Sequence, residues 1–256
     1  MTERFRASIE QIASDKIEVR LGGVYGLENV LKESPQDHTA IVDVLAGYVR
    51  NATYRGPSGL ELPHERNSSH REHAWGTELP VDLQAAVTVL ARRPDRREPR
   101  RVDLRHAHLA GMSLRHFEFD SPPRLAWMFL TSADLSRSDL RGVDFRGSIM
   151  NYADFCLGWL AGARLDGVGL FAADLRGTHL LDAELAGADL RSADLRESDV
   201  TAEQLSVAAI DATTRLPDSL QNDSWVAARL EECGNWDRAN RSQRTCAPPT
   251  PPSPRV

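Results

Sequence analysis

The 256-residue sequence has few cysteines, no long apolar stretch and no excess of positive charge, and each of these absences excludes a class of protein. It has three cysteines, Cys156, Cys233 and Cys246, and their odd number and wide spacing argue against a disulfide framework. No stretch reaches the roughly 20 apolar residues of a membrane span, and no apolar signal core follows the N-terminus. The formal net charge of −6 gives no general attraction to nucleic acid or anionic lipid. We therefore expect a cytoplasmic protein with no membrane span and no direct nucleic-acid binding.

What the sequence has in abundance is a five-residue period. Every fifth residue from Leu130 to Val200 is apolar, and the residue two positions before each is small, apart from Met128. Five residues of an α-helix turn about 500°, so the apolar positions would wind around its surface. On a flat strand an odd spacing would send them to alternate faces. The period fits a chain that turns a corner every five residues and points each central side chain into a narrow coil.

The repeated units themselves carry a family resemblance. Ala-Asp-Leu-Ser-Arg (133–137), Ala-Asp-Leu-Arg-Gly (173–177) and Ala-Asp-Leu-Arg-Glu (193–197) resemble the A-(D/N)-L-x-x motif of the pentapeptide-repeat family. The resemblance implies a right-handed quadrilateral β-helix with four pentapeptides per coil, here about five coils. An earlier, looser run through Leu104, Leu109, Leu114 and Phe119 resumes at Leu125 after a one-residue slip near residues 121–123.

The rest of the chain predicts a mixed fold class, with an α-helical domain before the β-helix and short helices after it. Three glycines (Gly22, Gly23, Gly26) lie inside one expected helix, so either another helix packs closely there or the helix is broken. Thr201 with Gln204 predicts a capping box that opens a helix through about Ala209. The expected segments are an N-terminal α-helical domain at 1–93 with a long loop at 51–78, a charged connector at 94–101, the pentapeptide-repeat β-helix at 102–205, C-terminal cap helices at 206–236 and a disordered Pro-rich tail at 237–256.

A ladder of aspartates is the first candidate site. Residues twenty apart should stack, which aligns Asp134, Asp154, Asp174 and Asp194. Some members of the family protect DNA gyrase from quinolone-type drugs by resembling duplex DNA, so the resemblance implies that this ladder could imitate a phosphate backbone. The alternative is that the position is the solvated Asp of the motif, bonded to a turn. Residues 130–200 hold twelve acids and seven arginines, about half the charge of DNA of equal length.

Large apolar residues outside the inward positions are the second candidate site. Phe129, Ile149, Trp159 and Phe171 lie off the inward columns, and Leu157 and Leu181 accompany them. Apolar area of this extent is usually covered. We expect it to be buried either by the flanking helices or by a second copy in a homodimer.

Catalytic and metal-binding patterns are weak. His64, His70 and His73 do not have the spacing of a zinc site, Cys156 is expected to be a packed neutral thiol, and no serine has the context of a nucleophile. We expect no enzyme activity, cofactor or metal. The sequence favours a protein–protein interaction scaffold with a partner of unknown identity. The alternative is a DNA-mimicking binder of DNA gyrase or topoisomerase that gives quinolone-type resistance, and an unrecognised enzyme comes last.

Overall fold

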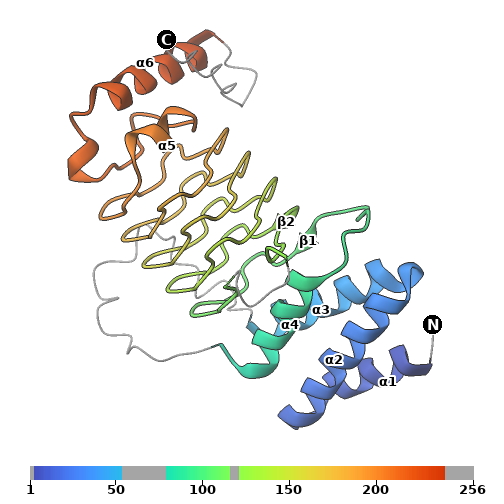
Figure 1. The fold of residues 1–256 in the computed structure, drawn as a ribbon. Coiled ribbons are helices and arrows are strands. Elements are labelled where there is room, and N and C mark those ends of the chain that lie inside the picture. Colours follow the sequence, from blue (N-terminus) through green and yellow to red (C-terminus); the bar gives the residue numbers. More distant parts are fainter. Residues whose placement is uncertain (1–2, 54–78, 116–120, 240–256) are drawn as a thin grey trace.

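The computed structural model describes residues 3–53, 79–115 and 121–239. Four helices come first, a stack of short bridged segments follows, and helices return at the end (Figure 1). The helices α1 to α4 gather at one end of the stack, and α6 lies at the other. In chain order the elements are α1 (Glu3–Ile12), α2 (Ile17–Glu33), η1 (Pro35–Asp37), α3 (His38–Thr53), α4 (Val81–Arg92), β1 (Val102–Asp103), β2 (Met128–Phe129), α5 (Ala202–Ser206), η6 (Asp218–Leu220) and α6 (Ser224–Ala239).

The glycines of α2 are explained by close packing. α2 is continuous from Ile17 to Glu33, so the helix is not broken. A Cβ on Gly23 would lie 2.7 Å from Ile12 and 2.8 Å from the carbonyl oxygen of Ser8, and one on Gly26 would lie within 3 Å of the Ser8 hydroxyl. The missing side chains therefore allow α1 to rest directly on α2.

Residues 103–115 and 121–208 form five stacked coils. Parallel bridges join residues twenty apart, as in Asp134 with Asp154 and Asp154 with Asp174, so that each regular coil holds four pentapeptides. The central residue of each pentapeptide and the small residue two before it are buried; Phe145, Phe155 and Leu135 are fully so. The inward pattern expected from the five-residue period is thus present. We number the coils 1 (103–128), 2 (129–148), 3 (149–168), 4 (169–188) and 5 (189–208).

Coil 1 differs from the others by an insertion. His108 and Ser113 pair with residues 26 positions later, whereas Arg124 pairs with Asp144 twenty positions later. The six extra residues fall between Ser113 and Arg124, so Leu125 takes the coil position after Leu114. The expectation that the pentapeptide of Phe119 continues the regular run is therefore wrong, although Phe119 itself lies outside the described residues. The described part of coil 1 thus has four pentapeptides in register with coil 2, centred on Leu104, Leu109, Leu114 and Leu125.

The ends of several elements shift from the expected boundaries. α3 continues to Thr53, inside the segment expected as a loop, and the hydroxyl of Thr53 donates to the carbonyl oxygen of Val49. α5 begins with the expected capping box at Thr201 but ends at Ser206. α6 continues to Ala239, past residue 236, because no proline interrupts the chain before Pro248.

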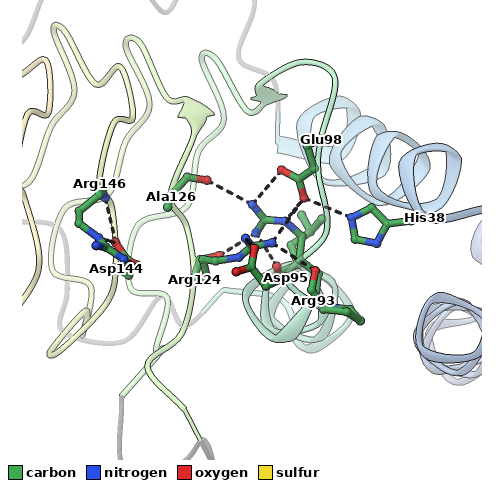
Figure 2. A network of polar contacts seen from close by, with 10 residues as sticks. His38, Arg93, Asp95, Glu98, Arg124, Ala126, Asp144 and Arg146 are labelled. Carbon is green, nitrogen blue, oxygen red and sulfur yellow. Dashed lines mark hydrogen bonds and ion pairs between the residues drawn. The ribbon is translucent and has the colours of Figure 1, made fainter. Parts of the chain in front are cut away.

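The junction between the helices and coil 1 is held by a buried ionic cluster (Figure 2). The Arg93 side chain is fully buried. Its Nε donates to Glu98 at 2.6 Å, and its Nη1 donates to the carbonyl oxygens of Leu90 and Arg124 at 2.8 and 2.7 Å. His38 Nε2 lies 3.3 Å from Glu98. Glu98 lies in the segment expected as a charged connector, 94–101, and it contacts His38 of α3, Arg93 and Arg124 of coil 1.

The protonation states of this cluster follow from its burial. Burial lowers the pKa of His38 by more than Glu98 raises it. Burial raises the pKa of Glu98, but Arg93, His38 and Arg124 together outweigh it, so the pKa of Glu98 is lowered overall. The cluster thus combines a neutral imidazole with a buried ion pair.

No helix in the described ranges has the length and apolar character needed to cross a membrane.

Candidate partner-binding surface

The outer surface of the coils consists of columns of residues twenty apart. The residue before each central position forms the bridge to the next coil, so four bridged columns run along the stack. Two of them concern the candidate sites. The aspartate column contains Asp134, Asp154, Asp174 and Asp194, and the tryptophan column contains Asp139, Trp159 and His179. Asp199 follows twenty residues after His179, and we include it in the tryptophan column because its carboxylate lies 3.2 Å from the His179 ring.

The structure brings the four predicted aspartates together as one column, but each carboxylate is engaged locally. Asp174 accepts hydrogen bonds from the backbone N–H of Arg176 and, at 2.6 and 2.9 Å, from its guanidinium. Asp194 is bonded in the same way by Arg196. Asp154 accepts the N–H of Cys156 at 2.9 Å. Each aspartate therefore caps the corner that follows it.

The charge of this column is consequently buried and largely compensated. Asp154 and Asp174 are buried, and the side chains of Asp134 and Asp194 are only 16% and 15% exposed. Burial raises the pKa of Asp134, but hydrogen bonds from His108 and Ser136 outweigh it and lower the pKa to about 2. At Asp174 and Asp194 a partner would meet the guanidinium groups of Arg176 and Arg196 beside the carboxylates.

The four residues of the predicted apolar interface do not form one patch. Phe129 and Ile149 are adjacent in one column, and Phe171 packs edge-on against Tyr152, with ring centroids 5.6 Å apart. Trp159 belongs to the tryptophan column, half a coil away, because ten residues separate it from Ile149. The guanidinium groups of Arg101 and Arg105 also lie over Phe129, at 5.7 and 5.5 Å.

Trp159 instead lies at the centre of a different surface. Its indole is 47% exposed and stacks on His179 of the next coil, with ring centroids 4.2 Å apart and planes tilted by 34°. Asp199 holds the other side of that imidazole, 3.2 Å from Nδ1, and the guanidinium of Arg141 lies 5.6 Å from the Trp159 ring. The twenty-residue spacing of Trp159 and His179 was the sequence signal for this stack.

Two exposed leucines border the tryptophan column. Leu157 lies at the corner before it and Leu181 at the corner after it, and both side chains are largely exposed. Leu157 has a φ of +58°, a left-handed conformation that is a genuine outlier for a bulky residue. We call Leu157, Trp159, His179 and Leu181 the tryptophan face.

Comparison with known proteins agrees with this arrangement. The family model for pentapeptide repeats matches residues 130–157 and 160–201, with eight copies. This chain contains a pentapeptide-repeat region. No curated protein is similar enough to count as a relative.

Solved structures with similar pentapeptide coils come from several sources. The pentapeptide repeat protein Rfr23 of the cyanobacterium Cyanothece 51142 is 22% identical, with 44% of this chain and 90% of that chain covered and a TM-score of 0.35. The pentapeptide repeat protein alr5209 of Nostoc Pcc 7120 is 26% identical, with 51% and 84% covered and a TM-score of 0.29. QnrB1, a plasmid-mediated fluoroquinolone resistance protein, is 19% identical, with 46% and 70% covered and a TM-score of 0.26.

Reactive groups do not converge on the pentapeptide coils. Within residues 3–53, 79–115 and 121–239, no three or more His, Cys, Asp or Glu side chains are grouped to hold a metal ion. His64, His70 and His73 lie outside the described residues. Burial raises the pKa of the Cys156 thiol to about 12, so it is a neutral, unreactive group at physiological pH. A cavity of about 460 Å³ beside coil 1 is lined by Asp103, ion-paired with Arg50 and Arg105.

Proposed function

We propose that the chain is a non-enzymatic protein–protein interaction scaffold that binds its partner through the tryptophan face. The observation that carries the proposal is the half-exposed indole of Trp159, held in place by His179. Tryptophan and arginine dominate the energetics of protein interfaces, particularly where neighbouring groups exclude water. The groups that could exclude water around Trp159 are the side chains of Arg141, Leu157 and Leu181.

The rigidity of the coils strengthens the proposal. Asp139, Trp159 and His179 of the tryptophan column are joined by parallel bridges, so their side chains start from a fixed backbone. A surface ordered before binding loses less conformational entropy when a partner docks. We propose that the coils form a right-handed quadrilateral β-helix, which the twenty-residue register supports, and that the protein acts in the cytoplasm.

Affinity capture tests the scaffold proposal. Purified full-length protein, Trp159→Ser and Trp225→Ser would each be immobilised and exposed to extract of the source organism, with bound proteins quantified by mass spectrometry. Trp225 on α6 is the matched control because its side chain is 63% exposed. We expect a partner that Trp159→Ser loses and Trp225→Ser keeps. Equal capture by all three proteins would contradict the proposal.

A second candidate is the DNA-mimicking gyrase binder, favoured by the regular alignment of four aspartates at the coil spacing. A mimic must present exposed negative charge, whereas Arg176 and Arg196 neutralise part of this column. A supercoiling assay with purified DNA gyrase, with and without a quinolone, decides the matter. Protection by the wild-type protein would support mimicry, and no effect on either reaction would exclude it.

A further inference from the structure

Two cavities adjoin along one face of α3, where the helices meet coil 1. The first has a volume of about 460 Å³ and contains the polar groups of Arg50, Asp103 and Arg105. The second has a volume of about 420 Å³, lies between α1 and α3 and has mainly apolar walls, formed by Ile9, Ile12, Ala13, Val44, Tyr48 and Ala52. Gly47 and Asn51 line both cavities. Together they form one cleft with a polar end and an apolar end, which we call the α3 cleft.

Gly47, where the two cavities adjoin, is a glycine that the packing of the described residues does not require. A Cβ built on it would meet no described atom within 4 Å, whereas Cβ atoms on Gly23 and Gly26 would overlap atoms of α1. A glycine inside a helix destabilises the folded state relative to alanine. Because glycine also allows a ligand to approach the backbone closely, its place in the wall of both cavities indicates a binding cleft.

The polar end of the cleft has more positive than negative charge in its described ion pairs. Arg50 donates one N–H to Asp103, and the side chain of Arg105 donates two at 2.9 Å. Hydrogen bonds from Arg105 lower the pKa of Asp103 to about 2, so this carboxylate is ionised at neutral pH. Two guanidinium groups thus share one carboxylate. Since a guanidinium has five N–H donors, both keep donors for a second anion.

The walls of the apolar end are fixed by contacts within the chain. The hydroxyl of Tyr48 donates to Asp82, whose buried carboxylate also accepts Nε of Arg20 at 2.6 Å. On the opposite wall, α1 is held against α2 by the close approach at Gly23 and Gly26. A cleft whose walls are ordered in advance loses less conformational entropy when a ligand binds.

We propose that the α3 cleft binds a small organic anion with an apolar body. The anionic group, a carboxylate, sulfonate or phosphate, lies against Arg50 and Arg105, and the apolar body passes over Gly47 and lies between α1 and α3. Ligand pockets of about 300–1,000 Å³ combine apolar walls with a few polar groups that orient the ligand, and they are frequent at domain boundaries. This site is separate from the tryptophan face, which lies on coils 3 and 4.

Fluorescence titration of the full chain with anilinonaphthalene sulfonate tests the proposal, because this probe joins a sulfonate to an apolar ring system. Its uncharged counterpart, phenylnaphthylamine, tests the charged end of the cleft. The variants are Gly47→Leu, which places a side chain where the cavities adjoin, and Arg50→Gln. We expect each variant to weaken binding of the anionic probe at least about tenfold. Arg50→Gln should leave binding of the uncharged probe unchanged.

Each variant has a matched control. Ala40→Leu introduces the same side chain at an exposed position of the same helix. Arg164→Gln removes an arginine that is 38% exposed and paired with Glu184, much as Arg50 is 40% exposed and paired with Asp103. Trp159→Ser tests whether the probe binds the tryptophan face instead. We expect all three controls to bind the anionic probe like wild type.

Three outcomes would overturn the inference. They are a wild-type protein that does not bind anilinonaphthalene sulfonate, binding that Gly47→Leu leaves unchanged, and an affinity for the anionic probe that Arg50→Gln leaves unchanged. Circular dichroism of each variant separates loss of binding from loss of fold, and if Gly47→Leu does not fold, the comparison of the two probes on Arg50→Gln still decides. None of these outcomes bears on the scaffold proposal, whose test depends on Trp159.

Discussion

At the scale of single residues, the corner after each central position imposes the strongest local requirement. Its φ is positive at glycines and at bulky residues alike, including Trp127, Tyr152 and Leu157. An L-residue in this conformation is less stable by roughly 1–2 kcal/mol than in a right-handed one. Trp127 recovers part of this through Arg101, which lies 3.5 Å from its ring.

The cost of a corner side chain can be measured by one substitution in two contexts. At Gly167, φ is +62° and a Cβ would meet no atom within 4 Å, and the space at Gly47 in α3 is equally open. We expect Gly167→Ala to lower the free energy of unfolding by about 1 kcal/mol and Gly47→Ala to raise it by a similar amount. Urea denaturation measures both. Changes of the same sign would contradict the assignment of backbone strain.

Asp134 makes the stability of the solenoid sensitive to acid. Its pKa is about 2 in the folded protein and close to 4 in an unfolded chain, so its contribution is complete above about pH 4 and is lost as the pH falls towards 2. The contribution is on the order of 2 kcal/mol. We expect the stability difference between wild type and Asp134→Asn to shrink over this window in urea titrations. A constant difference from pH 5 to pH 2 would exclude this role.

At the scale of elements, the contact between α1 and α2 depends on which glycine is replaced. A Cβ on Gly22 would have its nearest neighbour at 3.9 Å, whereas on Gly23 it would overlap the backbone of α1. We expect Gly22→Ala to stabilise the protein slightly, through helix propensity. Gly23→Ala should cost about 1–3 kcal/mol and increase hydrogen exchange in α1. Similar exchange in both variants would argue against the close contact.

The sequence predicts the inward columns of the coils because each position is decided by size and polarity alone. The period from Leu130 to Val200 therefore predicts the stacked coils, and Thr201 with Gln204 predicts the capping box that the structure contains. The role of an outer residue depends on the side chains that it contacts, and the five-residue period does not reveal these contacts. In the sequence, the only sign of the ion pair between Asp174 and Arg176 is their spacing of two residues. The placement of Trp159 and Ile149 in different columns follows only once the register of the coils is known. The burial of Arg93 depends on contacts with Glu98 and Arg124, which no local pattern predicts.

At the scale of the whole molecule, the Arg93 cluster is the buried ionic part of the contact between the helices and the coils, beside the two hydrogen bonds of the Gln84 side chain with Ser113. Removing one member of a buried ion pair leaves the other charge uncompensated and costs about 3–5 kcal/mol. We expect Arg93→Met to separate the unfolding of the helices from that of the coils, giving two transitions by calorimetry. The control Arg97→Ala, at an exposed position, should unfold like wild type. A single transition at the wild-type temperature in Arg93→Met would show that the cluster is dispensable.

The twenty-residue register of the bridges has a consequence for how such a chain can change in length. Deleting five residues within the stack would keep every central side chain pointing inward, but it would advance all later residues by a quarter of a coil. Trp159 and His179 would then lie in different columns if the deletion fell between them, and the fold would survive while the surface was scrambled. Only a gain or loss of twenty residues preserves both. The six extra residues of coil 1 lie between Ser113 and Arg124, and from Arg124 onward the twenty-residue spacing is kept through coils 2 to 4.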